Sequence, residues 1–354
     1  MDSETLYLLA KSQTGVATIL SAPGAPTTGT WFTGDLVVDS TNVLWVCVVG
    51  GSPGTWAVSA GVPYTKALPT FFLSTLPSAS QWQSVAYGNG VFVAVAYNSN
   101  SAAYSTNGGQ TWTAVTLPSS ADWTSITYGN GTFVAVASGG TTAAYSTNGG
   151  QTWTAVVLPA TADWWSVVYA NGVFVTIGKN STSAAYSTNG GVTWTTATLP
   201  SNQTWQALAY GGGTFVAIST GTVGAYSTNG GQTWTATTLP SSEWWDIAYG
   251  DGAFVIVSLN AALAGISIDG GVSWTTSTLP GNTTCSGITY GNNIFVAVAE
   301  SGVALYSLNA GQTWNSLSLP STAQWYSVVY GNGLFVAIAA TLGDAAYTPL
   351  SLSI

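Results

Sequence analysis

The chain repeats one pattern seven times, and this repetition limits the folds that are open to it. A Leu-Pro pair ends each repeat, and successive prolines are 40 or 41 residues apart. The seven prolines are Pro77, Pro118, Pro159, Pro200, Pro240, Pro280 and Pro320. A regular period of this length predicts a ring of similar structural units rather than one irregular core.

Each repeat contains four short runs that favour β-strands. In the first full repeat these runs cover residues 82–87, 91–96, 102–106 and 110–116. Tight turns are indicated at residues 88–90 and 107–109, since Gly and Asn accept positive φ at little cost. No stretch has helical periodicity, and four strands joined by hairpins make one propeller blade. The sequence therefore predicts an all-β fold, a seven-bladed β-propeller.

The last repeat predicts how the ring closes. Residues 321–348 supply only three strands, whereas residues 70–77 align with the fourth strand of the first full repeat, residues 111–118. We therefore expect the strand before Pro77 to complete the last blade. Such a strand exchange closes the ring and leaves no unpaired sheet edge.

The composition argues against several kinds of function. Only 4% of the residues are charged, the net charge is -9, and there is no Arg and no His. Nucleic-acid binding is not expected, because it needs clustered Lys or Arg. Membrane insertion is not expected either, since no apolar run approaches the ~20 residues of a spanning helix. No secretory signal is visible. Cys47 and Cys285 lack metal-ligand spacing and are expected to be buried thiols, so neither a metal site nor a cofactor is predicted.

Residues 1–63 do not share the repeat. Residues 1–30, which include a Pro- and Gly-rich segment, predict an extended N-terminal arm, and residues 31–63 predict a small β-module that anchors the protein. The propeller then covers residues 64–354. About forty residues form a weak core alone, so we expect support from neighbouring chains in a homo-oligomer such as a trimer.

The second turn of the repeat resembles a known motif. Residues 105–112, Ser-Thr-Asn-Gly-Gly-Gln-Thr-Trp, resemble the Asp-box, S-x-D-x-G-x-T-W, of sialidase-like propellers. The position of the acid is held by Asn107, Asn148, Asn189, Asn229, Asp269 and Asn309. The resemblance implies a structural turn in which this side chain caps backbone amides while the Trp packs between sheets.

The same resemblance raises the question of enzymatic activity. Sialidases clamp the substrate carboxylate with arginines, and this chain has none. A glycosidase that uses carboxylates such as Asp163 and Glu243 ranks last among the interpretations, because the acids of the repeats occupy non-equivalent positions. No catalytic residues are therefore predicted, and the protein is not expected to be an enzyme.

A second aromatic series opens the first strand of the repeats. Its members are Trp82, Trp123, Trp164, Trp205, Trp244 and Trp325, and Trp165 and Trp245 directly follow two of them. The first strand of a propeller blade is innermost, so all eight are candidates for glycan stacking near the central channel. Packing between blades is the alternative. Within each doubled pair, alternation along the strand places one indole on the opposite face, where exposure is expected.

The repeats differ most between their second and third strands, at residues 97–101, 138–142, 179–183, 219–223, 258–263, 300–303 and 339–344. In a propeller these loops share one face with the segments that enter the innermost strands. Variation confined to one face favours a recognition surface, although neutral drift of loops explains it as well.

The predicted N-terminal module carries a second resemblance. Its pattern from Gly29 through Trp45 and Cys47 to Trp56 resembles short modules of bacteriophage tail fibres and is similar to small chitin-binding modules of chitinases. The tail-fibre resemblance implies a virion protein of the tail or surface, attached to other virion proteins through its N-terminal region. Such a receptor-binding protein would recognise host surface glycan through the propeller. The alternatives are a structural virion decoration or baseplate component without receptor binding, and a cellular lectin-like propeller.

Overall fold

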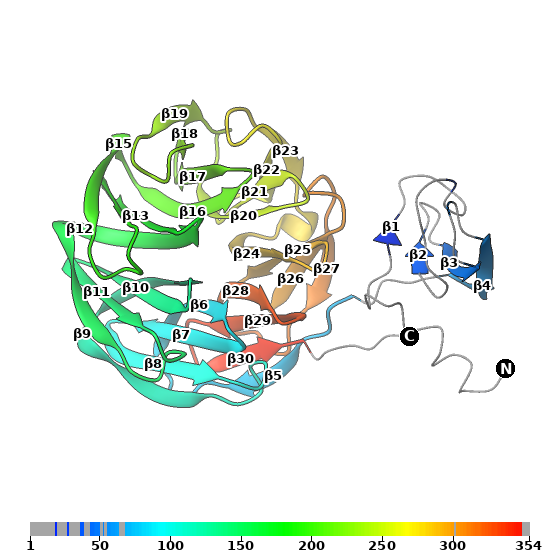
Figure 1. Ribbon diagram of the computed structural model, residues 1–354, viewed down its shortest axis with the longest axis horizontal. Helices are drawn as coiled ribbons and strands as arrows, with labels where there is room; N and C mark the ends of the chain where they lie inside the picture. Colours follow the sequence, from blue (N-terminus) through cyan, green and yellow to red (C-terminus); the bar gives the residue numbers. More distant parts are fainter. Residues whose placement is uncertain are drawn as a thin grey trace. The chain divides into compact units, whose positions relative to one another are not determined.

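Strands make up nearly all of the regular structure (Figure 1). The computed structural model describes residues 18–19, 27, 36–38, 43–49, 52, 55–63, 68–300 and 302–348. Its contacts divide the chain after Leu68, and the larger unit covers Pro69–Leu350. Among the described residues the one helical element is a 3₁₀ turn, Pro280–Asn282. The all-β prediction is therefore confirmed.

Three blades of the larger unit form one continuous ten-stranded sheet. This sheet is continuous because β9 (Thr113–Gly129) and β12 (Thr154–Ala170) each belong to two neighbouring blades. Its other strands are β6 (Gln81–Gly88), β7 (Val91–Tyr97), β8 (Ser99–Ser105), β10 (Thr132–Ser138), β11 (Gly140–Ser146), β13 (Val173–Lys179), β14 (Ser181–Ser187) and β15 (Thr195–Gln203).

Four further blades are separate four-stranded sheets. The fourth contains β16 (Trp205–Gly211), β17 (Thr214–Ser219), β18 (Val223–Ser227) and β19 (Thr235–Thr238), and the fifth contains β20 (Trp244–Gly250), β21 (Ala253–Ser258), β22 (Leu263–Ser267) and β23 (Thr275–Thr278). The sixth contains β24 (Cys285–Gly291), β25 (Ile294–Ala299), β26 (Val303–Ser307) and β27 (Asn315–Ser318), and the seventh contains β28 (Trp325–Gly331), β29 (Leu334–Ala339), β30 (Asp344–Tyr347) and β5 (Phe72–Thr75). Figure 1 shows the blades arranged around a central axis, with β6, β16, β20, β24 and β28 towards it. The prediction of a seven-bladed propeller is confirmed.

The ring closes through the predicted strand exchange. The strand β5 lies antiparallel to β30, and Leu73 pairs with Ala346. The N–H of Leu76 also donates to the carbonyl of Gly343 at 2.8 Å. The Leu76 side chain is buried in a cluster with Trp82 of the first blade. The seventh blade is therefore built from the first and the last strands of the propeller.

The prolines do not always end a strand, which differs from the sequence prediction. The strand β9 continues through Pro118, and β12 continues through Pro159. In the pairing of β8 with β9, the register jumps from Thr116 to Ala121. The proline lies within this irregular step, where no ladder hydrogen bond from its missing N–H is required.

Tyrosines and glycines join neighbouring blades at the ends of the innermost strands. A Cβ added to Gly129 would lie 1.9 Å from Cγ of Tyr169 in the next blade. The same contact is found at Gly88, Gly211, Gly250, Gly291 and Gly331. Each tyrosine also packs on a phenylalanine of its own blade, with ring centroids 4.6 to 4.9 Å apart. The repeated Tyr-Gly pair is therefore a packing requirement, and only the third blade has alanine there, Ala170.

The N-terminal unit contains a four-stranded sheet of its own. Its order is β1 (Thr18–Ile19), β2 (Leu36–Val38), β3 (Val43–Val49) and β4 (Thr55–Pro63). The first pair is parallel and the other two are antiparallel. Thr18–Ile19, which fall within the predicted arm, thus pair with residues of the predicted module. Most of the arm lies outside the described residues, as does Trp31.

Candidate functional site

The six strand-opening tryptophans lie inside the blade interfaces. Trp82, Trp123, Trp164, Trp205, Trp244 and Trp325 are each 0% or 1% exposed. Trp82, for example, packs with Val85 of its own blade and Ile338 of the seventh. Each indole N–H donates to the backbone carbonyl four residues earlier, at 2.8 to 3.2 Å. These six side chains have no surface on which a sugar could stack, so packing between blades accounts for them.

The Asp-box side chains organise the second hairpin of the first six blades. Asn107 Oδ1 accepts the N–H of Thr111 at 3.0 Å, and its Nδ2 donates to Thr111 Oγ1 at 2.8 Å. The indole of Trp112 donates to the carbonyl of Gly109 at 3.1 Å. Asn148, Asn189, Asn229 and Asn309 make the same bonds in their own turns. These are the bonds that a turn-stabilising role requires.

Asp269 makes these contacts as a carboxylate. It accepts two hydrogen bonds from Ser273, one from its N–H at 2.9 Å and one from its hydroxyl at 2.5 Å. Burial of the carboxyl acts to raise its pKa, but the bonds from Ser273, Ser267 and Val272 together hold the pKa below its ordinary value. The acid therefore has a structural partner for its charge.

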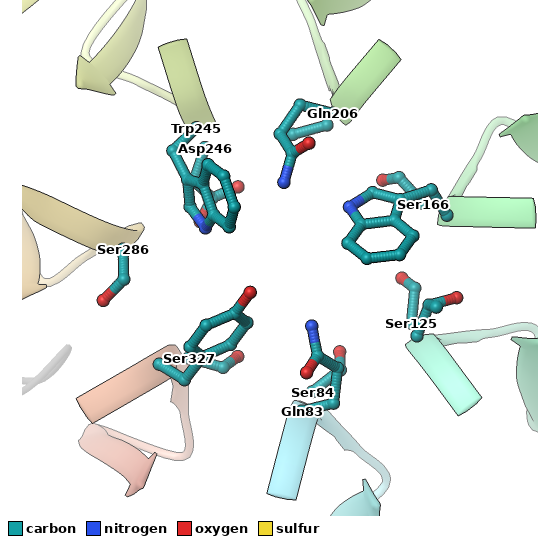
Figure 2. Close-up of a pocket in the computed structure, with 13 residues that line it drawn as sticks. Gln83, Ser84, Ser125, Ser166, Gln206, Trp245, Asp246, Ser286 and Ser327 are labelled. Carbon is teal, nitrogen blue, oxygen red and sulfur yellow. The ribbon is translucent and has the colours of Figure 1, made fainter. Parts of the chain in front are cut away.

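The residues directly after the strand-opening positions line the central channel. Each innermost strand has a register shift at this point, as between Trp82 and Ser84 in the first blade. Such a bulge leaves one residue without a ladder partner and redirects its side chain. The seven bulge residues are Gln83, Thr124, Trp165, Gln206, Trp245, Ser286 and Tyr326, and all of them line one cavity (Figure 2). The cavity holds about 460 Å³ of empty space, which includes its opening to solvent.

Hydroxyl groups one residue further along join the blades around this channel. Ser84 Oγ accepts the N–H of Ile126 in the next blade at 3.2 Å. Ser125 and Ser166 make the equivalent bond at 3.1 Å. The fourth blade has Ala207 at this position and lacks the hydroxyl.

Asp246 compensates for the missing hydroxyl. Its Oδ1 accepts the N–H of Ile247, and its Oδ2 accepts the N–H of Ile288 in the sixth blade, both at 2.8 Å. Asp246 as a whole is half-buried and lines the channel, yet its carboxyl group is buried. Burial raises the pKa of Asp246 to about 7, although both N–H bonds act to lower it. The channel therefore contains an acid that titrates near neutrality.

A lysine lies over the aromatic side chains of the channel. Lys179 Nζ is 3.8 Å from the ring centroid of Trp165 and 5.8 Å from that of Trp245. Trp245 packs edge-on against Tyr326, with centroids 6.3 Å apart. We call the end of the channel formed by Lys179, Trp165, Trp245 and Tyr326 the channel mouth. Its geometry is that of a cation held between aromatic rings.

Carboxyl groups surround the channel mouth. Burial lowers the pKa of Lys179, while Asp163 and Glu243 act to raise it. Burial raises the pKa of Tyr326, and the charges of Glu300 and Asp246 raise it further. Asp122 acts on Tyr97, which is outside the mouth: burial raises the pKa of Tyr97, and the hydrogen bond and charge of Asp122 raise it further. Lys179 is the one lysine among the described residues, and the chain has no arginine. The electrostatic potential around the mouth is therefore negative.

Gln206 presents an unsatisfied hydrogen-bond acceptor in the channel. The residue is 4% exposed, and its Oε1 has no hydrogen-bond partner. Figure 2 shows its amide at the wall of the cavity, with the nitrogen towards the centre and the oxygen turned aside. A buried acceptor left without a donor costs about 1–3 kcal/mol. Of the Gln206 amide, the nitrogen is therefore the group that faces the cavity.

Sequence reasoning placed Trp165 and Trp245 among the candidates, and both are half-buried and line the channel. It did not single out Gln83, Gln206 or Tyr326. The sequence does contain one indication of these positions. The residue after the strand-opening site varies from repeat to repeat, whereas the residues beside it tend to recur. Lys179 was noted only as part of a variable loop, and its place over two indoles depends on the ring.

Three further features of the described residues concern metal binding, the cysteines and membrane-spanning helices. Across the described ranges, no three His, Cys, Asp or Glu side chains come together in a way that could hold a metal ion. Cys47 and Cys285, both expected as buried thiols, are buried and form no disulfide. Within the same described part of the chain, no helix has the length and apolar character needed to cross a membrane.

Comparison with protein-family models supports the repeat. The BNR/Asp-box repeat matches residues 103–114, 144–155 and 225–236. These segments each contain the third strand, the capped turn and the Trp described above. None of the curated proteins with which the sequence was compared matches it significantly. The chain is thus a β-propeller that carries Asp-box repeats.

Solved structures share this fold at low sequence identity. YCF48 bound to D1 peptide aligns over 81% of this chain and 97% of its own, with a TM-score of 0.67 and 17% identity. Virginiamycin B lyase from Staphylococcus aureus aligns over 79% of this chain and 99% of its own, with a TM-score of 0.70 and 12% identity. YCF48 from Cyanidioschyzon merolae has a TM-score of 0.63 and 13% identity over 78% and 98% of the two chains. At such identities the similarity defines the fold alone.

Proposed function

We propose that the protein is a non-catalytic binding protein that recognises carbohydrate at the channel mouth. The observation that carries this proposal is the pair of half-buried indoles, Trp165 and Trp245, which line one cavity together with two glutamine side chains. A sugar ring presents an apolar face that stacks on an indole, while its hydroxyls need polar partners at the edge. Gln83 and Gln206 provide such partners at the wall of the same cavity.

A binding role is favoured over catalysis by the residues that the chain contains. One of the similar structures is a catalytically inactive His-to-Ala variant of virginiamycin B lyase with quinupristin. This chain contains no histidine at all. The acid in the channel, Asp246, uses both carboxyl oxygens to accept backbone N–H groups of neighbouring strands, which is a structural use of the group.

Binding of the purified full-length protein to a glycan array and to host envelope fractions tests the proposal. We expect Trp165→Ala and Trp245→Ala to weaken sugar binding at least about five-fold each, because a lost stacking contact is worth about 1 kcal/mol or more. Trp112→Ala is the control, since it removes a half-buried indole from an Asp-box turn outside the channel. Unaltered binding by both channel variants, or no binding to any glycan, would refute the proposal.

A peptide is the second candidate ligand. One similar propeller was solved with a bound peptide. A peptide array run beside the glycan array separates the two, because only one of them should respond to Trp165→Ala.

We also propose that the protein acts in a bacteriophage particle, as a tail fibre or a similar receptor-binding protein. The support is the sequence pattern of residues 31–63, together with the near absence of charged residues. In this role the N-terminal region attaches to other virion proteins, and the protein assembles as a homo-oligomer such as a trimer. Host surface glycan is then the ligand of the propeller. Immunogold labelling of purified virions tests this assignment, and absence of the chain from the particles would exclude it.

A further inference from the structure

We infer that the carbohydrate recognised at the channel mouth is a cationic amino sugar, a hexosamine whose amine is free and protonated. This inference rests on the carbohydrate-binding role proposed above and names the class of sugar. Two observations carry it: the lysine that lies over the indoles, and the carboxyl groups around it.

The lysine shows what the aromatic surface accepts. Lys179 Nζ lies 3.8 Å above the ring of Trp165 and faces Trp245 at 5.8 Å. The face of an indole attracts an ammonium group electrostatically. Lys179 therefore occupies the position that the ammonium group of a ligand would take. Its four-carbon stem is flexible, so the side chain can move aside when a ligand enters.

The surrounding charges favour a cation over other ligands. Four acids act on the residues of the mouth: Asp163, Glu243, Glu300 and, above its pKa of about 7, Asp246. They face a single ammonium group, that of Lys179. An acidic sugar would be repelled, and a neutral or N-acetylated sugar would gain hydrogen bonds but no charge–charge attraction from these carboxylates. An amino sugar gains both the attraction and the stacking of its ring.

The test measures the affinity of the full-length protein for four probes below neutral pH, where the amine is charged. The probes are the tetramers of glucosamine and of N-acetylglucosamine, cellotetraose, and tetralysine. We expect the glucosamine tetramer to bind at least about ten-fold more tightly than the two uncharged sugars. Its affinity alone among the sugars should fall as salt is added.

Two variants of Lys179 sharpen the result. Lys179→Met keeps the length of the stem and removes the competing cation, so the glucosamine tetramer should bind roughly ten-fold more tightly than to the wild type. Lys179→Arg keeps a cation on the indoles and is the matched control, which we expect to show no such gain.

The results separate failure of the amino-sugar inference from failure of the carbohydrate proposal. Equal binding of the charged and uncharged tetramers, without an effect of Lys179→Met, would overturn the amino-sugar inference and leave the carbohydrate proposal standing. Failure of every sugar to bind the wild type and both variants would overturn both. Binding of tetralysine without binding of the glucosamine tetramer would also overturn the inference, because the mouth would then select a cationic peptide.

Discussion

At the scale of single residues, Asn replaces Asp in five of the six Asp-boxes without loss of the turn. The carbonyl oxygen of each Asn accepts the N–H that the carboxylate of Asp269 accepts in its own box. The amide nitrogen adds a bond to a threonine hydroxyl. The turn therefore needs an acceptor of the right length and not a charge.

We predict that Asn107→Ala lowers the free energy of unfolding by about 1–2 kcal/mol, because the N–H of Thr111 loses its acceptor. Asp269→Asn is the matched comparison and should change it by less than about 0.5 kcal/mol near neutral pH, since five turns already use Asn. Urea unfolding followed by tryptophan fluorescence measures both. Equal losses in the two variants would show that the charge of Asp269 has a role of its own.

We predict a larger effect at the tyrosine–glycine contacts. Gly129→Ala places a Cβ 1.9 Å from Cγ of Tyr169, so the ring must move, at a cost of about 1–3 kcal/mol. Gly140→Ala is the control, because a Cβ there meets no atom within 4 Å. It should leave stability unchanged or raise it slightly. Thermal unfolding of the two variants tests this, and an unaffected Gly129→Ala would mean that the ring adapts as it must beside Ala170.

Some contacts of the candidate site could not be predicted from the sequence. Strand alternation predicted that one member of the pair Trp164–Trp165 would be exposed, but it did not tell which. The bulge decides this, since it breaks the alternation and directs Trp165 into the channel. Bulges depend on the pairing partner, and a single strand sequence does not report them. The contact between Lys179 and Trp245 joins different blades and was likewise not visible.

At the scale of elements, the blades follow closely from the turns. Repeated Gly and Asn residues mark the first hairpin of every blade and the second hairpin of six blades, and the apolar run after the first hairpin becomes the second strand. The alignment of residues 70–77 with residues 111–118 also located the closing strand correctly. The sequence did not predict that β9 continues through Pro118. Proline is disfavoured at strand positions whose N–H pairs with a neighbouring strand, but Pro118 occupies an unpaired position.

We predict that the closing strand is held mainly by Leu76. This side chain is 2% exposed, so Leu76→Ala should lower the free energy of unfolding by about 2–4 kcal/mol. Leu73 lies in β5, three residues before Leu76, but is 51% exposed. Leu73→Ala should therefore cost less than about 1 kcal/mol. Calorimetry tests both variants, and similar small losses would mean that the closure depends on its backbone hydrogen bonds.

At the scale of the whole molecule, stability should depend on pH through Asp246. Its pKa is about 7 in the folded protein and 3.8 in the unfolded chain. Between these values the folded protein keeps a proton that the unfolded chain releases. The contribution of Asp246 to stability is therefore largest in acid and falls as the pH rises from about 4 towards 7, by at most about 4 kcal/mol.

Unfolding of the wild type and of Asp246→Asn at about pH 4 and about pH 8 tests this prediction. The variant cannot ionise, so it should lose most of the difference between the two conditions. It should also be less stable in acid by about 1–3 kcal/mol, because one amide oxygen replaces two acceptors. An identical pH dependence in both proteins would show that another group is responsible.

The pairing of β5 with β30 also has a consequence for synthesis. The ribosome makes β5 before every other strand of the propeller and β30 after all of them, so β5 has no sheet partner until the ring is almost finished. Blades whose strands are neighbours in sequence can fold as they emerge. The nascent chain must keep β5 from pairing with a second copy during this wait, since an open strand edge is a template for another chain. The strand β5, which closes the finished ring, is thus the segment most open to wrong pairing while the protein is being synthesised.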